Sequence, residues 1–111
     1  MPYEFGEVVL VRFPFTSQTA FKQRPAVVVS NKAYNGARPD AVIMAITSQL
    51  HSPSSWGDVL IDQWQAANLL KLSAIKPVFA TLEQSLTLKR LGMLYLSDQS
   101  ALRHGIAALL G

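Results

Sequence analysis

The chain has 111 residues, of which half are apolar and 15% are charged, and this composition favours a folded domain over a disordered chain. It contains no cysteine, so disulfides and thiolate metal sites are excluded. Ten Lys and Arg residues against seven Asp and Glu residues give a net charge of +3, which permits an anionic partner without requiring one.

Signals for membrane insertion or export are not evident. The apolar segments all fall short of the roughly 20 residues that a membrane-spanning helix needs. The first residues, Met1-Pro2-Tyr3-Glu4, lack the basic and apolar regions of a signal peptide. We therefore expect a cytoplasmic protein that does not associate with membranes, with residues 1–111 forming one domain.

The first predicted strand covers residues 6–13, which follow a glycine turn and are rich in β-formers. Pro14 ends this strand, because proline cannot donate to a β-ladder. Residues 16–23 form a polar loop that is long for a hairpin. Such a loop is either a binding segment or a mobile connection, and both interpretations remain open.

Two runs of Val, Ile and Ala predict the central strands. Residues 26–30 follow the charged entry Lys22-Gln23-Arg24-Pro25, and residues 41–47 lead into Ser48-Gln49. Both runs are too short for helices and are bounded by turn formers, which is typical of buried strands. The Asn35-Gly36 pair between them predicts a tight turn.

The next predicted elements are less regular. Residues 58–61 alternate well enough for a short strand, and residues 63–71 predict a turn or a short helical insertion. Within that insertion, Asn68 is able to adopt the left-handed conformation. Residues 73–81 predict a strand that is bent or bulged at Pro77.

The C-terminal part predicts a helix. Residues 83–91 fit either a helical turn or a strand, and residues 92–96 predict a last extended segment. Ser97 is expected to cap the helix, and Asp98 suits the positive end of its dipole. Gly105 would allow close approach to a neighbouring element. An apolar stripe at i, i+4, i+7 and i+8 is formed by Leu102, Ile106, Leu109 and Leu110.

These elements together predict the fold class. Five or more short strands and one terminal helix indicate a mainly β protein with a C-terminal helix. We expect a small, strongly bent antiparallel sheet that closes into an SH3-like barrel.

The two central strands also predict a binding site. If they lie side by side and antiparallel, Arg24 at the start of the first comes near Thr47 and Ser48 at the end of the second. A guanidinium beside hydroxyls on the rim of a sheet suits a phosphodiester. The other cations considered for a basic face are Lys22, Lys32, Arg38, Lys71, Lys76, Lys89 and Arg90. They either gather on one face of the protein or are simply solvated, and both interpretations remain open.

Blocks along nearly the whole chain resemble the MazF/PemK family of toxin endoribonucleases. The opening blocks are residues 6–15, residues 23–30 with the Arg24-Pro25 strand entry, and residues 45–49 with the Ile46-Thr47-Ser48 strand exit. Later blocks in the same order are Gly57-Asp58-Val59, Trp64-Gln65 through Leu69-Leu70-Lys71, and Thr81-Leu82 through Gly92-Met93-Leu94.

The resemblance implies an SH3-like barrel that forms a homodimer. It also implies a type II toxin that cleaves single-stranded RNA without a metal or other cofactor. Besides the RNA substrate, the resemblance implies a protein partner, a cognate antitoxin that occupies the substrate groove.

The resemblance also implies roles for single residues. Arg24 matches the family arginine and would stabilise the phosphoryl oxygens, while Thr47 matches the family hydroxyl and would bind the phosphate. Lys76 stands near the position of a second family arginine. Supporting or RNA-binding positions around these residues are Ser48, Gln49, Lys22, Gln23 and His51.

A general base is not evident in the sequence. Lys76 is followed by Pro77-Val78-Phe79, where some relatives carry an acid, and residues 16–23 offer neither histidine nor carboxylate. Arg24 itself or Glu83 would have to act, although Glu83 also fits a structural acid. Weak or absent nuclease activity is therefore an open alternative.

Other sites are less well supported. His51 and His104 lack the spacing of a metal pair and are expected at the surface or at a cap. Ser30 and Ser48 have no plausible catalytic triad, and no glycine-rich phosphate loop is present. Trp56 and Trp64 would either stack on unpaired bases or anchor the core or a dimer.

Two alternative functions remain beside the nuclease. The first is an RNA- or antitoxin-binding module on the same barrel, which the missing base favours. The second is a gyrase poison resembling the CcdB family. That family relies on a C-terminal tryptophan, whereas this sequence ends Leu109-Leu110-Gly111, so we rank this alternative last.

Overall fold

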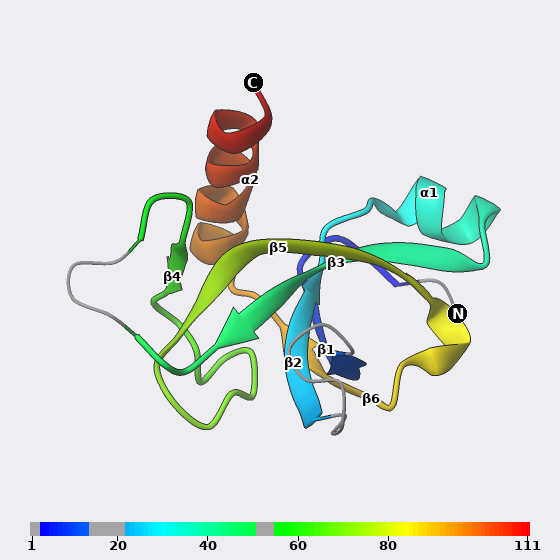
Figure 1. The fold of residues 1–111 in the computed structure, drawn as a ribbon, viewed down its shortest axis with the longest axis horizontal. Helices are drawn as coiled ribbons and strands as arrows, with labels where there is room; N and C mark the ends of the chain where they lie inside the picture. Colours follow the sequence, from blue (N-terminus) through cyan, green and yellow to red (C-terminus); the bar gives the residue numbers. More distant parts are fainter. Residues whose placement is uncertain (1–2, 14–21, 51–54) are drawn as a thin grey trace.

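The computed structural model describes residues 3–13, 22–50 and 55–111, and its chain path is shown in Figure 1. The described part is mainly β, with one short and one longer α-helix. The strands are β1 (Glu7–Phe13), β2 (Lys22–Val28), β3 (Asp40–Thr47), β4 (Val59–Ile61), β5 (Ser73–Glu83) and β6 (Lys89–Met93). The helices are α1 (Lys32–Ala37), the 3-10 helix η1 (Gln84–Leu86) and α2 (Leu96–Leu110).

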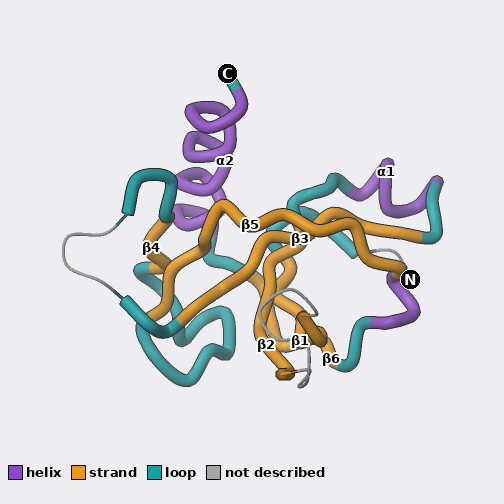
Figure 2. The backbone as a smooth tube through the Cα atoms, viewed as in Figure 1, coloured by secondary structure: helices purple, strands orange, loops and turns teal. Residues whose placement is uncertain are grey.

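The strands of the described residues form one sheet in the order β4-β5-β3-β2-β1-β6. Every neighbouring pair is antiparallel, and the sheet curls strongly, as Figure 2 shows. The predicted mainly β fold with a bent antiparallel sheet and a C-terminal helix is confirmed. No helix of the described residues is long and apolar enough to cross a membrane.

The curled sheet buries apolar residues on both faces, because successive side chains of a strand point to opposite sides. One core cluster, which α2 covers, includes Val8, Val27, Met44, Ile46, Ile75 and Leu102. The other includes Val9, Val11, Ala26, Val28, Ala41 and Ile43. The two clusters fix the register of β1, β2 and β3, since a slip by one residue would exchange the two faces.

The predicted tight turn at Asn35-Gly36 is wrong, because these residues belong to helix α1. The Asn31 side chain accepts a hydrogen bond from the Tyr34 backbone N–H and caps the helix. Asn35 is buried and donates from Nδ2 to the backbone oxygens of Tyr3 and Ser30. These tertiary contacts override the turn preference of an Asn-Gly pair.

The bend predicted at Pro77 is confirmed. The register of β3 against β5 shifts between Met44 and Ile46, opposite the part of β5 that contains Pro77. Residues 83–91 contain both alternatives, because η1 supplies a helical turn and β6 begins at Lys89. The extended segment predicted for residues 92–96 therefore starts earlier and ends earlier.

Helix α2 begins one residue before the predicted cap. Tyr95 is the N-cap residue and makes no side-chain cap bond, so the prediction that Ser97 caps the helix is wrong. Asp98 lies in the first turn as predicted, and it accepts hydrogen bonds from the backbone N–H groups of Asp62 and Gln63. These bonds tie the start of α2 to the segment that follows β4.

The apolar stripe of α2 is only partly covered. Leu102 is buried and Ile106 packs against the first core cluster, but Leu110 is 69% exposed because α2 projects away from the sheet (Figure 1). Close approach at Gly105 is confirmed. A Cβ added at that glycine would lie 2.8 Å from Cγ2 of Val59 in β4.

Candidate functional site

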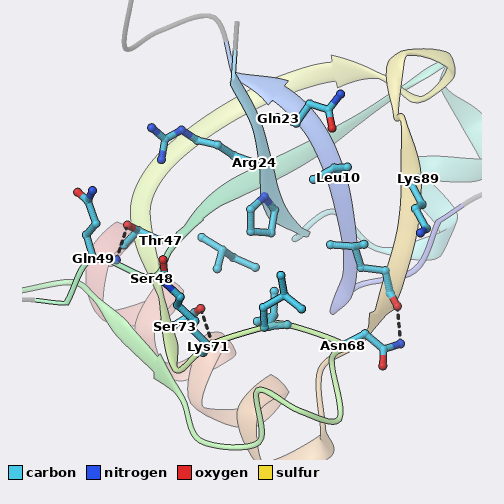
Figure 3. A pocket seen from close by; sticks show the side chains of 15 residues that line it. Leu10, Gln23, Arg24, Thr47, Ser48, Gln49, Asn68, Lys71, Ser73 and Lys89 are labelled. Atoms are coloured by element: carbon cyan, nitrogen blue, oxygen red, sulfur yellow. Dashed lines mark hydrogen bonds between the residues drawn. The ribbon is translucent and has the colours of Figure 1, made fainter.

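The register of β2 and β3 brings Arg24 and Thr47 together. The paired residues of the two strands end with Ala26 opposite Ala45, and continuing this antiparallel register by two residues places Arg24 opposite Thr47. Directly opposed residues point to the same side of a sheet. Figure 3 shows the two side chains beside each other, with Ser48 and Gln49 close by.

These residues lie at the rim of a pocket of about 900 Å³. A volume of this size is at the upper end of the range for small-molecule sites. The pocket is lined by Leu10, Gln23, Arg24, Pro25, Ile46, Thr47, Ser48, Gln49, Asn68, Leu69, Leu70, Lys71, Ser73, Lys89 and Leu91. It therefore combines side chains from β1, β2, β3, β5 and β6 with the segment that joins β4 to β5.

The floor of the pocket is aliphatic, and its edges are polar. The apolar residues that line the pocket include Leu10, Pro25, Ile46, Leu69 and Leu91. The edges carry three cations, Arg24, Lys71 and Lys89, together with hydroxyl and amide groups (Figure 3). Among the described residues that line the pocket, none carries a carboxylate or an imidazole.

Arg24 is available for a ligand. Its Nε atom is buried and has no hydrogen-bond partner in the structure. An unsatisfied buried donor is costly, and the energetic penalty disappears when an anion binds. A planar guanidinium with free donors is suited to a pair of phosphate oxygens.

Two other arginines interact within the protein instead. Arg38 forms a salt bridge with Asp40 at 3.0 Å and lies over the Tyr34 ring at 5.3 Å. Arg90 forms a salt bridge with Glu7 at 3.0 Å and lies over the ring of Tyr3. Both arginines are therefore paired with a carboxylate and a tyrosine ring of the protein itself.

The cluster around Asp40 changes the acid–base properties of its members. The hydrogen bonds from Arg38 and then from Tyr34 lower the pKa of the Asp40 carboxyl below its ordinary value. The hydrogen bond that the Tyr34 hydroxyl donates to Asp40 raises the pKa of that hydroxyl. These residues do not line the pocket at Arg24 and Thr47, and their network links α1 to the start of β3.

The predicted supporting residues are distributed unevenly. Gln23, Ser48 and Gln49 line the pocket with Arg24 and Thr47, and the Gln49 backbone N–H donates to Thr47 Oγ1 at 3.1 Å. Lys76 is not among the lining residues, so the structure does not bring it to this pocket. His51 and the side chain of Lys22 lie outside the described part of the protein.

Sequence reasoning did not assign four polar residues of the pocket: Asn68, Lys71, Ser73 and Lys89. Asn68 has a φ of +59°, which confirms its predicted left-handed conformation. Its Nδ2 donates to the Leu91 backbone oxygen at 2.6 Å, which fixes the 63–71 segment against β6. Lys71 and Lys89 are among the cations that the sequence analysis named for a basic face, which was the available signal.

The remaining candidates lie away from the pocket. Trp64 packs partly buried against the core, whereas Trp56 is 77% exposed, and neither lines the pocket. Glu83 ends β5 opposite Asp40, also outside the pocket. No group of three or more His, Cys, Asp or Glu side chains that could hold a metal occurs among the described residues.

Comparison with known proteins identifies the family. The family model described as "PemK-like, MazF-like toxin of type II toxin-antitoxin system" matches residues 4–110. The chain belongs to this family. A search of curated protein sequences finds no significant match.

Solved structures share the fold of this PemK/MazF-family chain. MazF from Deinococcus radiodurans has a TM-score of 0.77 at 21% identity, covering 100% of this chain and 98% of that chain. An endoribonuclease from a mycobacterial species, solved with its cognate antitoxin, has a TM-score of 0.75 at 19% identity, covering 99% and 94%. The Mycobacterium tuberculosis toxin MazF-mt6 has a TM-score of 0.75 at 15% identity, covering 94% and 95%.

Proposed function

We propose that this toxin-family protein is an endoribonuclease that cleaves single-stranded RNA without a metal ion. The observation that carries the proposal is Arg24, whose buried Nε lacks a partner and which lies beside Thr47 at the rim of a cationic pocket. The aliphatic floor of that pocket is accessible to unstacked bases, which single strands present and duplexes do not.

The chemistry assigns a role to each of these side chains. The ribose 2′-hydroxyl loses its proton as its oxygen attacks the adjacent phosphorus. The bond to the 5′-oxygen breaks and that oxygen takes up a proton, leaving a cyclic phosphate and a 5′-hydroxyl. Arg24 stabilises the charge that develops on the phosphoryl oxygens, and the hydroxyl groups of Thr47 and Ser48 donate hydrogen bonds to them. Loss of one such donor group costs about 10²–10³-fold in turnover.

A second candidate function is an RNA- or antitoxin-binding module that does not cleave. It is favoured by the lack of carboxylate and imidazole groups among the described lining residues, because the 2′-hydroxyl must lose a proton during cleavage. Arg24 and Glu83 remain the proton-transfer candidates from the sequence. Cleavage assays separate the two functions directly.

We also propose a cognate antitoxin as the protein partner and a homodimer as the assembly. Family membership supports both, since the family consists of toxins of toxin–antitoxin systems. MazF of Deinococcus radiodurans and a mycobacterial endoribonuclease have each been solved with an antitoxin, MazE in the first case. An antitoxin that covers the pocket would block RNA access.

The test is cleavage of a mixed-sequence single-stranded RNA by the purified, antitoxin-free protein in the presence of EDTA. We expect cleavage by the wild type and a loss of at least about 100-fold in Arg24→Ala and Thr47→Ala. Lys32→Ala serves as the matched control, because Lys32 is exposed on α1 outside the pocket. Circular dichroism confirms that each variant is folded. Intact RNA at high protein excess, together with retained binding, would favour the binding module.

A further inference from the structure

The pocket has a second cationic end that the proposed chemistry does not use. Lys89 of β6 lies opposite Leu10 of β1, and Leu10 lies opposite Pro25 of β2. Pro25 and Lys89 are therefore two strands apart, which separates their backbones by about 10 Å, since neighbouring strands are about 4.8 Å apart, and Arg24 is the residue next to Pro25. Figure 3 shows the side chains of Arg24 and Lys89 on opposite sides of the pocket.

Lys89 is free to bind a ligand, unlike its neighbour in the chain. Arg90 is occupied by Glu7 and by the Tyr3 ring. Lys89 is exposed, lines the pocket and forms no salt bridge with any described residue. An ammonium group with three free donors acts as a point charge for phosphate, without the fixed geometry that a guanidinium imposes.

The surface between the two cations is apolar, which favours a ligand with a ring or another apolar group between its charges. Leu10, Pro25 and Ile46 contribute to the apolar lining of the pocket, and none of its described lining residues is a carboxylate that would neutralise either end. A ligand that fits must place negative charges at both edges and an apolar ring between them. Consecutive nucleotides of a single RNA strand have this arrangement, because each base lies between two phosphates.

We propose that Lys89 binds a second phosphate of the RNA, which flanks the scissile phosphate held at Arg24. This inference rests on the proposed function and adds a substrate requirement to it. The nucleoside between the two phosphates lies over the aliphatic floor. Lys89 contributes to RNA binding and takes no part in bond breaking, so a dinucleoside monophosphate is a poor substrate.

The test uses an oligoribonucleotide that the wild type cleaves at one site, taken from the mixed-sequence assay. Each phosphate around this site is replaced in turn by an uncharged methylphosphonate, and kcat/KM is measured for the wild type and Lys89→Gln. At one flanking position we expect the methylphosphonate to lower kcat/KM about tenfold in the wild type and less than about twofold in Lys89→Gln, because the variant already lacks the interaction with that phosphate. The double-mutant cycle isolates this interaction. Lys32→Gln, with the same change of charge on α1, should retain the wild-type pattern.

The same oligonucleotides, with a 2′-deoxy sugar at the cleavage site, are also tested for binding by fluorescence anisotropy. This keeps the inference testable if the protein binds RNA without cutting it. If every flanking methylphosphonate weakens cleavage or binding by the same factor in Lys89→Gln as in the wild type, the second phosphate site is overturned. An equal loss for Lys89→Gln and Lys32→Gln would overturn it as well, since it would indicate only long-range electrostatics. Absence of both cleavage and binding would overturn the proposed function itself.

Discussion

Gly92 tests whether the wall of the pocket depends on close packing between two backbones. A Cβ added at this glycine would lie 2.8 Å from the Ala67 backbone oxygen and 2.9 Å from its carbonyl carbon. It would also lie 3.2 Å from Asn68 Nδ2. Ala67 is fully buried, so Gly92→Ala must push the 63–71 segment away from β6.

The expected destabilisation follows from two contributions. Overpacking against an immobile backbone costs about 1–3 kcal/mol. Displacement of Asn68 weakens its 2.6 Å hydrogen bond to the Leu91 oxygen, which contributes about 0.5–1.5 kcal/mol. Gly92→Ala should therefore lower the free energy of unfolding by about 2–4 kcal/mol, as measured by urea denaturation. It should also weaken RNA binding, because the 63–71 segment places Lys71 at the pocket and its displacement would move Lys71 away.

Gly105→Ala is the matched control. Its added Cβ would meet only Cγ2 of Val59, and alanine in a helix gains about 1 kcal/mol over glycine. We expect a net change below about 1 kcal/mol and unchanged RNA binding. If Gly92→Ala unfolds at the same urea concentration as the wild type, the 63–71 segment is not held against β6 and the reasoning fails.

Three further predictions concern single interactions. Asn68→Gly tolerates the left-handed backbone and loses only the hydrogen bond to Leu91, so urea denaturation should show about 1 kcal/mol of destabilisation. Asn68→Ala also strains the backbone and should lose about 2 kcal/mol. Equal losses for the two variants would contradict this account. Asp98→Ala removes the acceptor for two backbone N–H groups and should cost about 3 kcal/mol in the same assay, with Asp98→Asn near half of that. Because Arg38 lowers the pKa of Asp40, the stabilisation from this pair is present above the ordinary carboxyl pKa and is lost as the pH falls through the lowered pKa. Arg38→Gln should raise the pKa of Asp40 in an NMR titration, and an unchanged pKa would refute the assigned cause.

The meeting of Arg24 and Thr47 could be predicted because it depends on local rules. Both strands are marked by β-branched runs, and an antiparallel pair necessarily brings the start of one strand to the end of the other. The bend at Pro77 and the left-handed Asn68 could be predicted for a similar reason. Each follows from the conformational limits of one residue type.

The other side of the pocket could not be predicted, because it depends on contacts between distant segments. Lys71 reaches the pocket only because the segment that carries it packs on Gly92 and is bonded to Leu91. Likewise, α1 replaces the expected turn because the Asn35 side chain is bonded to Tyr3, about 30 residues away in the chain. No local pattern in the sequence encodes these contacts.

The positions of the two tryptophans determine what intrinsic fluorescence can report. Trp64 packs against the core and Trp56 is exposed near β4, so emission from the first should follow unfolding, while emission from the second should resemble that of a solvated indole throughout. Neither indole borders the hollow between Arg24 and Lys89. Titrations with nucleotides therefore require an extrinsic dye, and a silent tryptophan signal would not mean an empty pocket.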